Sequence, residues 1–300
     1  MPARCRRRRA ACQAAVWVQV LYAAHGNAAA SEEPRFAPWQ PLFQGVEGAA
    51  GAVAAPRPQA AYAVRIDLQH PAVRLLLTPG NGDAPGETTS QTASEFLTHH
   101  KLQAAVNAHF YGPCCAATPE GKDLVGLAIA AGVEVSAAAT QGTGVQVLLI
   151  DADRRVRLAA TSRPIDLQHV EIALAGSHRL LCEGQSVAPA DGEGFLGPHP
   201  RTAMGTTADG RYLVWLVIDG RQPGYSEGAT LRETAEWLLR AGVADGLNLD
   251  GGGSTELVTA DAAGQPRLLN RPVGRGTAGS ERLNGSHLGV FAPALPSDPP

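Results

Sequence analysis

The chain has 300 residues and a formal net charge of −3 at pH 7, and arginines near its N-terminus supply much of its positive charge. The rest of the chain is therefore more acidic, which argues against nucleic acid as a partner. Without the first 30 residues, about 270 remain, which is enough for one large domain or two small ones.

Residues 1–30 have the three parts of a signal peptide. Met1 to Arg9 is strongly basic, and Ala10 to Ala24 is mostly apolar but shorter than the roughly 20 residues that a membrane-spanning helix needs. Small residues then precede Ser31, as signal peptidase requires. A basic arm that binds nucleic acid or an anionic membrane explains this order less well. We therefore predict a secreted or periplasmic protein, cleaved near Ala30–Ser31 and without a stable membrane anchor afterwards; the Sec and Tat export routes both stay open.

The next segments are assigned from composition and periodicity. Residues 31–60 are rich in Pro, Ala and Gly and are predicted to form an irregular lead-in, whereas residues 293–300 are predicted to be a disordered tail. Between them, residues 61–292 are predicted to form one domain. Its expected strands, with 61–68 and 73–78 as a hairpin, cover residues 61–68, 73–78, 102–106, 124–130, 145–150, 170–174, 212–218, 244–249 and 288–291.

Two helices complete the predicted α+β fold, a mixed, strand-rich sheet with a few packed helices. Residues 90–100 have a helical pattern. Residues 230–241 begin with a capping box formed by Thr230 and Glu233, and Gly242 is typical of the end of a helix. The helix lies between the strands 212–218 and 244–249, so the sequence predicts a β-loop-α-β unit whose loops meet at one edge of the sheet.

Three cysteines lie outside the predicted signal peptide. Cys182 can pair with Cys114 or Cys115, and these two neighbours can also pair with each other. A catalytic thiol is the more specific interpretation, but the sequence does not identify a general base for it. We therefore predict a structural disulfide and leave its pairing open.

The segment that most strongly indicates chemistry is Asn248 to Thr255. Asn248 and Asp250 flank Leu249 at the end of a strand, so their side chains share one face. The three glycines that follow let the backbone approach a ligand closely and offer amide donors. The pattern predicts an anion or sugar pocket; the alternative is a tight turn in which Asp250 satisfies local amides.

Two further residues stand at predicted strand ends. Asp219 follows the strand 212–218, where an ordinary turn aspartate is the alternative. Arg201 precedes another apolar segment, and its guanidinium fork suits phosphate or carboxylate; taken alone, it would more often be a surface residue.

These segments occur in the order and spacing of the phosphodiester glycosidase family, which the chain resembles from about Ala61 to Ala292. The resemblance is carried by Arg201–Gly205, Asp219-Gly-Arg221, Ser226-x-Gly228 and its following helix, Asn248–Thr255, Asn107–Tyr111, Asn270–Pro272 and Glu281–Arg282. It implies an exported hydrolase that cleaves the glycosidic bond of a sugar-1-phosphodiester.

The departures from the family pattern bear on the substrate more than on the reaction type. Ala108 and His109 replace two glycines, which narrows the pocket or adds His109 as a ligand-binding or proton-transfer group. A histidine packed beside the strand is the structural alternative. Glu256 replaces a small or hydroxylic residue, and residues 283–286 are also atypical.

The resemblance implies roles for the candidate residues. Asp250 is the first candidate for the carboxylate that stabilises or attacks an oxocarbenium-like carbon, and Asp219, Glu281 or His109 are candidates for the general acid or base. Arg201, Arg221 and Arg282 would hold the phosphate. The remaining substrate-binding candidates are Asn107, Asn248, Gly251, Gly252, Gly253, Ser254 and Thr255.

Two other functions stay open at this point. One is a glycoside hydrolase that acts on a non-phosphorylated polysaccharide, and the other is a non-catalytic polysaccharide-binding or envelope protein. The expected partner is a carbohydrate phosphodiester or an envelope polysaccharide. No cofactor is required by the sequence; clustered Asp and Asn oxygens can bind Ca²⁺, but no metal ligands are assigned.

Overall fold

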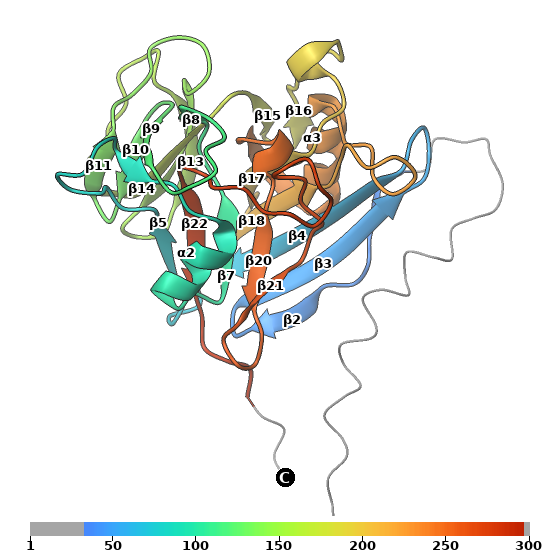
Figure 1. Ribbon diagram of the computed structural model, residues 1–300, viewed down its shortest axis with the longest axis horizontal. Coiled ribbons are helices and arrows are strands. Elements are labelled where there is room, and N and C mark those ends of the chain that lie inside the picture. The colour runs from blue at the N-terminus through green and yellow to red at the C-terminus, as the bar shows by residue number, and fades with distance from the viewer. Residues whose placement is uncertain (1–32, 297–300) are drawn as a thin grey trace, which may run out of the picture.

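The computed structural model describes residues 33–296 (Figure 1). The predicted signal peptide, residues 1–30, lies outside the described residues, as does the second half of the predicted tail, residues 297–300. At the start of that tail, Pro293 O and Ala294 O accept hydrogen bonds from Gln44 at 2.9 and 2.8 Å, so these two residues are held against the domain. Strands dominate the described residues, and α2 (Ala93–His100) and α3 (Leu231–Arg240) are their two α-helices.

The largest sheet is antiparallel. Its strands lie in the order β1 (Arg35–Phe36), β3 (Val46–Val53), β4 (Gln59–Asp67), β18 (Tyr212–Ile218), β17 (Arg201–Thr207), β19 (Val243–Asn248), β15 (Arg179–Cys182) and β16 (Gln185–Ser186), with β2 (Gln40–Phe43) on β3. The predicted strand–helix–strand unit is present as β18, α3 and β19. Because β17 is antiparallel to both β18 and β19, the ends of β18 and β19 meet the start of β17 at one edge.

The predicted irregular lead-in is wrong where β1, β2 and β3 form. Strand β3 has the sequence VEGAAGAV and pairs with β4 from Val46↔Ile66 to Val53↔Gln59. Its small residues make room for α3: a Cβ added at Gly51 would lie 2.6 Å from Trp237 Cζ3. Because β3 packs closely against a helix, it has small residues in place of alternating bulky side chains. Its sequence therefore lacks the pattern from which a strand is predicted.

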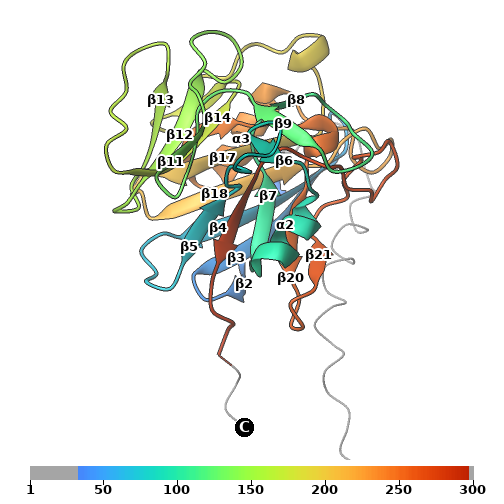
Figure 2. The same cartoon turned by 60° about the vertical axis from the view of Figure 1, so that its left-hand side comes forward.

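Two five-stranded sheets and a small three-stranded one complete the fold. One contains β21 (Pro266–Leu268), β20 (Leu257–Ala260), β7 (Ala104–Asn107), β22 (His287–Phe291) and β5 (Arg74–Leu77), and α2 packs on it (Figure 2). The second contains β11 (Val133–Ser136), β10 (Ala128–Ala130), β14 (Val170–Gly176), β12 (Gln146–Asp151) and β13 (Val156–Ala160). The third contains β6 (Thr88–Thr89), β9 (Gly121–Leu124) and β8 (Tyr111–Gly112), and two 3-10 turns are η1 (Gly194–Leu196) and η2 (Gly252–Ser254).

The predicted hairpin between residues 61–68 and 73–78 is also wrong. Strand β4 is already paired with β3 on one side and β18 on the other, so β5 has no free edge there and joins β22 instead. Side chains from the large sheet and both five-stranded sheets then meet in one buried cluster that includes Val64, Trp215, Val106, Leu174 and Leu288. This core holds the strand ends that carry the candidate site.

Candidate active site

Three candidate residues meet because of the register of β17. Arg201 at its start pairs with Ile218, the residue before Asp219, and Ala203 pairs with Asn248, two residues before Asp250. The edge of the large sheet therefore brings one arginine and two aspartates together from segments far apart in the sequence.

The Asp250 carboxylate lies at the centre of this group. Its Oδ2 accepts a hydrogen bond from Ser254 Oγ at 2.5 Å and lies 4.0 Å from Arg282 Nη2. The side chain is 14% exposed, so it can be reached from outside. Burial raises the pKa of Asp250 from 3.8 to about 6, although Ser254 and Arg282 act in the opposite direction. At neutral pH the group is mostly ionised, yet it can take up a proton near physiological pH.

The glycine turn after Asp250 lies between two guanidinium groups. A Cβ added at Gly252 would lie 3.1 Å from Arg221 Nη2, and one added at Gly253 would lie 3.0 Å from Arg282 Nη1. Gly252 also has a φ of 63°, in the left-handed region that favours glycine. The backbone at Gly252 thus favours glycine, and a side chain at Gly252 or Gly253 would displace the end of Arg221 or Arg282 by a few tenths of an ångström.

Both of these arginines have N–H groups that could bind a ligand, and Arg282 also forms an ion pair with Asp250. Arg282 Nη2 donates to Ser254 Oγ, whereas its Nε is buried without a partner among the described residues. Arg221 is exposed, and its Nη2 lies 3.5 Å from His199 Nδ1. A planar guanidinium with free N–H groups suits an anion such as phosphate.

Arg201 is placed differently from the prediction that it binds phosphate directly. It is 2% exposed; its Nε donates to Ala229 O at 2.8 Å, and its Nη2 donates to Phe195 O and Gly197 O at 2.7 and 2.6 Å. Burial, with a smaller contribution from Arg221, lowers the pKa of Arg201 to about 10, so the group stays charged at neutral pH. It anchors two loops and adds positive potential to the site.

Asp219 is enclosed rather than exposed. Its carboxylate accepts hydrogen bonds from Asn270 Nδ2 at 2.9 Å, the Arg271 N–H at 2.9 Å and Tyr225 Oη at 3.0 Å, and the residue is 1% exposed. Burial raises the pKa of Asp219, while these three donors lower it. With its oxygens occupied, Asp219 is a positioning residue for the loops around the site.

Glu281 and Glu256 both contact the N-terminus of α2. Glu281 Oε1 accepts from the Ser94 N–H at 3.0 Å, and Glu256 Oε2 accepts from the Ala93 N–H at 3.2 Å. The partial positive charge of a helix N-terminus favours carboxylates at this position. Glu281 therefore holds the segment before Arg282 against α2, which accounts for it without the predicted catalytic role. Burial raises the pKa of Glu256 well above its ordinary value.

The predicted amide and hydroxyl ligands lie beneath the glycine turn. Asn107 Nδ2 donates to Asp250 O at 2.7 Å, and its Oδ1 accepts from Thr202 Oγ1 at 2.8 Å. Thr255 Oγ1 accepts from Thr202 Oγ1 at 3.4 Å. Asn248 Nδ2 donates to Ser177 Oγ at 2.9 Å, while its Oδ1 is buried without a partner in residues 33–296. Asn107 and Thr255 support the turn instead of facing a ligand.

The structure favours the structural alternative for His109. The side chain is 1% exposed; Nδ1 lies 3.0 Å from Ser286 Oγ, and Nε2 accepts from the Ala175 N–H at 3.0 Å and lies 3.1 Å from Leu127 O. Burial lowers the pKa of His109 to about 4, so the ring is neutral at pH 7. It joins the two five-stranded sheets in the interior.

Two residues that the sequence analysis did not select adjoin the arginines. His199 Nε2 donates to Gly194 O at 2.7 Å, which leaves Nδ1 as an acceptor toward Arg221. Tyr111 Oη donates to Leu283 O at 2.9 Å, beside Arg282. Burial lowers the pKa of His199 and raises that of Tyr111. The sequence offered one signal for each of them: His199 lies two residues before Arg201, and Tyr111 is the last residue of the Asn107–Tyr111 segment.

Among the pairings left open, the disulfide joins Cys114 to Cys115, and Cys182 is a free thiol. Cys182 ends β15 near one edge of the large sheet, whereas Cys114 and Cys115 follow β8 in the small sheet. The disulfide is exposed and lies beside the candidate site, because Cys115 Sγ accepts from Arg282 Nη1 at 3.3 Å.

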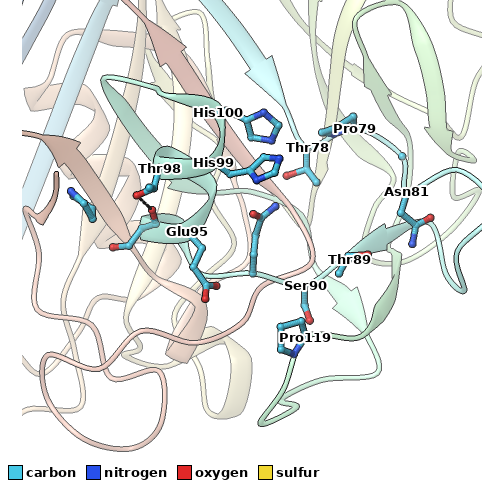
Figure 3. Close-up of a pocket in the computed structure, with 14 residues that line it drawn as sticks. Thr78, Pro79, Asn81, Thr89, Ser90, Glu95, Thr98, His99, His100 and Pro119 are labelled. Carbon is cyan, nitrogen blue, oxygen red and sulfur yellow. Dashed lines mark hydrogen bonds between the residues drawn. The ribbon is translucent and has the colours of Figure 1, made fainter. Parts of the chain in front are cut away.

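An open groove of about 760 Å³ lies along α2 (Figure 3). Several of its hydroxyl groups are already used, as in the bond from Thr98 Oγ1 to Ser94 O at 2.8 Å and that from Thr78 Oγ1 to His287 O at 3.3 Å. None of the predicted site residues lines this groove.

Residues 33–296 contain no cluster of three His, Cys, Asp or Glu side chains able to hold a metal ion. In the same range, no helix is both long and apolar enough to cross a membrane.

Comparison with known proteins gives a family match and similar folds. A sequence model of the phosphodiester glycosidase family matches residues 100–291. The zebrafish N-acetylglucosamine-1-phosphodiester alpha-N-acetylglucosaminidase catalytic domain, auto-inhibited by its pro-peptide, is 18% identical, with a TM-score of 0.60 over 87% of this chain and 88% of that one.

Two further structures have a similar fold. A hypothetical protein from Synechocystis is 14% identical, with a TM-score of 0.60 over 85% of this chain, which spans 64% of that protein. A putative exported protein from Burkholderia pseudomallei is 17% identical, with a TM-score of 0.57 over 79% of this chain and 75% of the other. A search of curated proteins gives no significant match.

Proposed function

The chain belongs to the phosphodiester glycosidase family, and from that premise we propose that it hydrolyses the bond between the anomeric carbon of a sugar and a phosphodiester oxygen. One observation carries the proposal: the reachable Asp250 carboxylate lies 4.0 Å from Arg282 Nη2, and the glycine turn that follows it lies against the guanidinium groups of Arg221 and Arg282. A carboxylate that can act on the sugar, beside cations that can bind the phosphate, supports this reaction.

Substrate binding rests on the two arginines at the turn. A phosphodiester carries one negative charge, and Arg221 and Arg282 both have N–H groups that are not used within the described part of the chain. The Arg282 side chain is 15% exposed, so an oxyanion can approach its guanidinium from outside. Arg201, charged and without a carboxylate partner in residues 33–296, strengthens the attraction.

The chemical step needs one ionised carboxylate. As the anomeric C–O bond breaks, its electron pair leaves with the phosphate, and positive charge develops on the sugar carbon. Asp250 stabilises or attacks that carbon. Water then supplies the new hydroxyl at the anomeric position, and its remaining proton passes to the carboxylate or to solvent. The products are the free sugar and a phosphate monoester.

Protonation of the leaving group matters little in this reaction. A phosphate monoester has a second pKa near ~6, so it departs without a proton at neutral pH, provided that its charge is neutralised. Arginines can therefore take the place of a general acid. This fits a site in which Asp219 is enclosed and Glu281 is bonded to α2.

The test is turnover of a panel of sugar-1-phosphodiesters and matched neutral glycosides. We expect release of free sugar from phosphodiesters only. D250N should reduce turnover by at least about 10³-fold, as expected for loss of an essential carboxylate. R221Q should raise KM, with R163Q at an exposed arginine as its matched control. Cleavage of neutral glycosides at equal rates would instead establish an ordinary glycoside hydrolase, and binding without turnover would establish a carbohydrate-binding protein.

We also propose that the enzyme acts outside the cytoplasm, on a carbohydrate phosphodiester or an envelope polysaccharide. This rests on the order of basic, apolar and small residues in residues 1–30. N-terminal sequencing of the protein from an expressing bacterium should find Ser31 as its first residue, and an uncleaved N-terminus in the cytoplasmic fraction would contradict the proposal.

A further inference from the structure

Arg282 contacts three other parts of the chain at the candidate active site. Its Nη2 donates to Ser254 Oγ, and its backbone N–H donates to Glu256 Oε1 at 2.5 Å. Its Nη1 donates to Cys115 Sγ at 3.3 Å. Two of these contacts, to Ser254 and Glu256, come from the glycine turn and the short segment after it, but the third comes from a separate exposed loop. The orientation of the guanidinium therefore depends partly on that loop.

The loop between β8 and β9 is fixed at both ends. Tyr111 Oη donates to Leu283 O at 2.9 Å, next to Arg282, and Lys122 Nζ donates to Pro113 O at 2.7 Å. Between these anchors, Cys114 and Cys115 are joined to each other. A bond between neighbouring side chains removes the free rotation of both. It thereby holds Cys115 Sγ at the place where Arg282 contacts it.

We propose that the Cys114–Cys115 disulfide is a positioning element for Arg282, so that the affinity of the site for the substrate phosphate depends on whether this pair is oxidised. The inference rests on the proposed function, because it takes Arg282 as a phosphate-binding group. It assigns a role to the adjacent cysteines that the proposed reaction does not otherwise use.

Reduction changes the neighbour of Arg282 in two ways. A dithiol breaks the S–S bond by supplying two electrons and two protons; it leaves as its own disulfide, and Cys114 and Cys115 become thiols. The freed Cys115 side chain rotates, so Arg282 loses a fixed contact. A Cys115 thiolate would also place a negative charge beside the guanidinium and compete with phosphate for it. Both effects weaken the binding of an anion.

The experiment compares oxidised and reduced protein that starts at Ser31, and therefore lacks Cys5 and Cys12, and that carries C182S, which removes the one free thiol of residues 33–296. Dithiothreitol is applied and removed by desalting under nitrogen, and thiol titration verifies two new thiols per chain. Binding of inorganic phosphate is measured by calorimetry, beside turnover of a sugar-1-phosphodiester. We expect reduction to raise the Kd for phosphate and the KM about tenfold, the effect of losing one charge-assisted hydrogen bond. The change in kcat should be smaller than that in KM.

Two variants supply controls. C114A/C115A should bind phosphate as weakly as the reduced protein and should not respond to dithiothreitol. R282K should bind phosphate weakly in both redox states, since the group that the disulfide positions is gone. If the double variant fails to fold, the redox comparison in C182S decides the matter alone.

The outcomes separate the two proposals. Equal phosphate affinity before and after reduction, with two thiols titrated and an unchanged circular dichroism spectrum, would overturn this inference and leave the proposed function standing. A lack of both phosphate binding and turnover in either redox state would overturn the proposed function, and the inference would fall with it.

Discussion

The raised pKa of Asp250 makes a quantitative prediction about stability. Burial raises this pKa from 3.8 to about 6 in the folded protein. The folded state then binds the proton more tightly than the unfolded state, so the ionised carboxylate costs stability. At 1.36 kcal/mol per pH unit, the difference corresponds to about 3 kcal/mol, an upper estimate.

The sign of the pH dependence follows directly. Below pH 3.8 the group is protonated in both states and costs nothing. Between pH 3.8 and about 6 it ionises in the unfolded state first, so stability falls as pH rises, and above about 6 the full cost is present. D250N removes the ionisation. The free energy of unfolding of D250N, minus that of the wild type, should therefore rise by up to about 3 kcal/mol from pH 4 to pH 7.5.

The assay is urea unfolding of both proteins at several pH values, supported by melting temperatures. At roughly 2–4 °C per kcal/mol, the melting temperature of D250N relative to the wild type should rise by about 6–12 °C over this range. D83N, at an exposed aspartate, sets the baseline. A difference that stays flat, or that falls as pH rises, would refute the assignment of Asp250 as a buried, costly carboxylate.

Three other predictions follow from the same site. The proposed reaction requires ionised Asp250, so kcat/KM should fall as pH decreases through about 6, toward tenfold per pH unit. A profile that is flat down to pH 4.5 would contradict this prediction. G252A should lose about 1 kcal/mol of stability and at least about tenfold in kcat/KM, because its Cβ would lie 3.1 Å from Arg221 Nη2. The control is G264A, which has a φ of 76° and no neighbouring atoms around an added Cβ, so it should lose stability without losing activity. R201Q leaves buried carbonyls unpaired and should lower the free energy of unfolding by about 2–4 kcal/mol in urea titrations, against almost none for R163Q.

Local signals predicted the part of the fold that carries the site. The capping box at Thr230, with Glu233, marks the start of α3, and the apolar runs before Asp219 and Asp250 are strands β18 and β19. The turn could also be predicted from its three glycines, because glycine allows the closest approach of neighbouring groups to the backbone. These features depend on neighbours in the sequence, so the sequence is sufficient to find them.

The roles of other residues depend on partners far along the chain. Glu281 contacts α2, whose Ser94 is 187 residues away, and His109 lies between two sheets with Ala175 as a partner. Neither hydrophobic periodicity nor a short motif indicates which residues contact each other when they are so far apart in the sequence. Strand β3 was not predicted for a related reason: the Trp237 ring leaves no room for a side chain at Gly51, and these two residues are far apart in the sequence. The resemblance to the family marked Glu281 and His109 as candidates for chemistry, whereas both side chains link segments that are far apart in the sequence.

The central position of β17 has a consequence for how the protein becomes active. Strands β17 and β18 are joined by a short turn, so Arg201 and Asp219 can come together early in folding. Asp250 joins them only when β19 docks on the other side of β17, and Arg282 lies later still, just before β22. Contacts between residues distant in sequence form slowly, because they require closure of long loops. A partly folded chain in which Arg282 is not yet in place lacks part of the anion site, so activity should begin only after nearly the whole domain has folded.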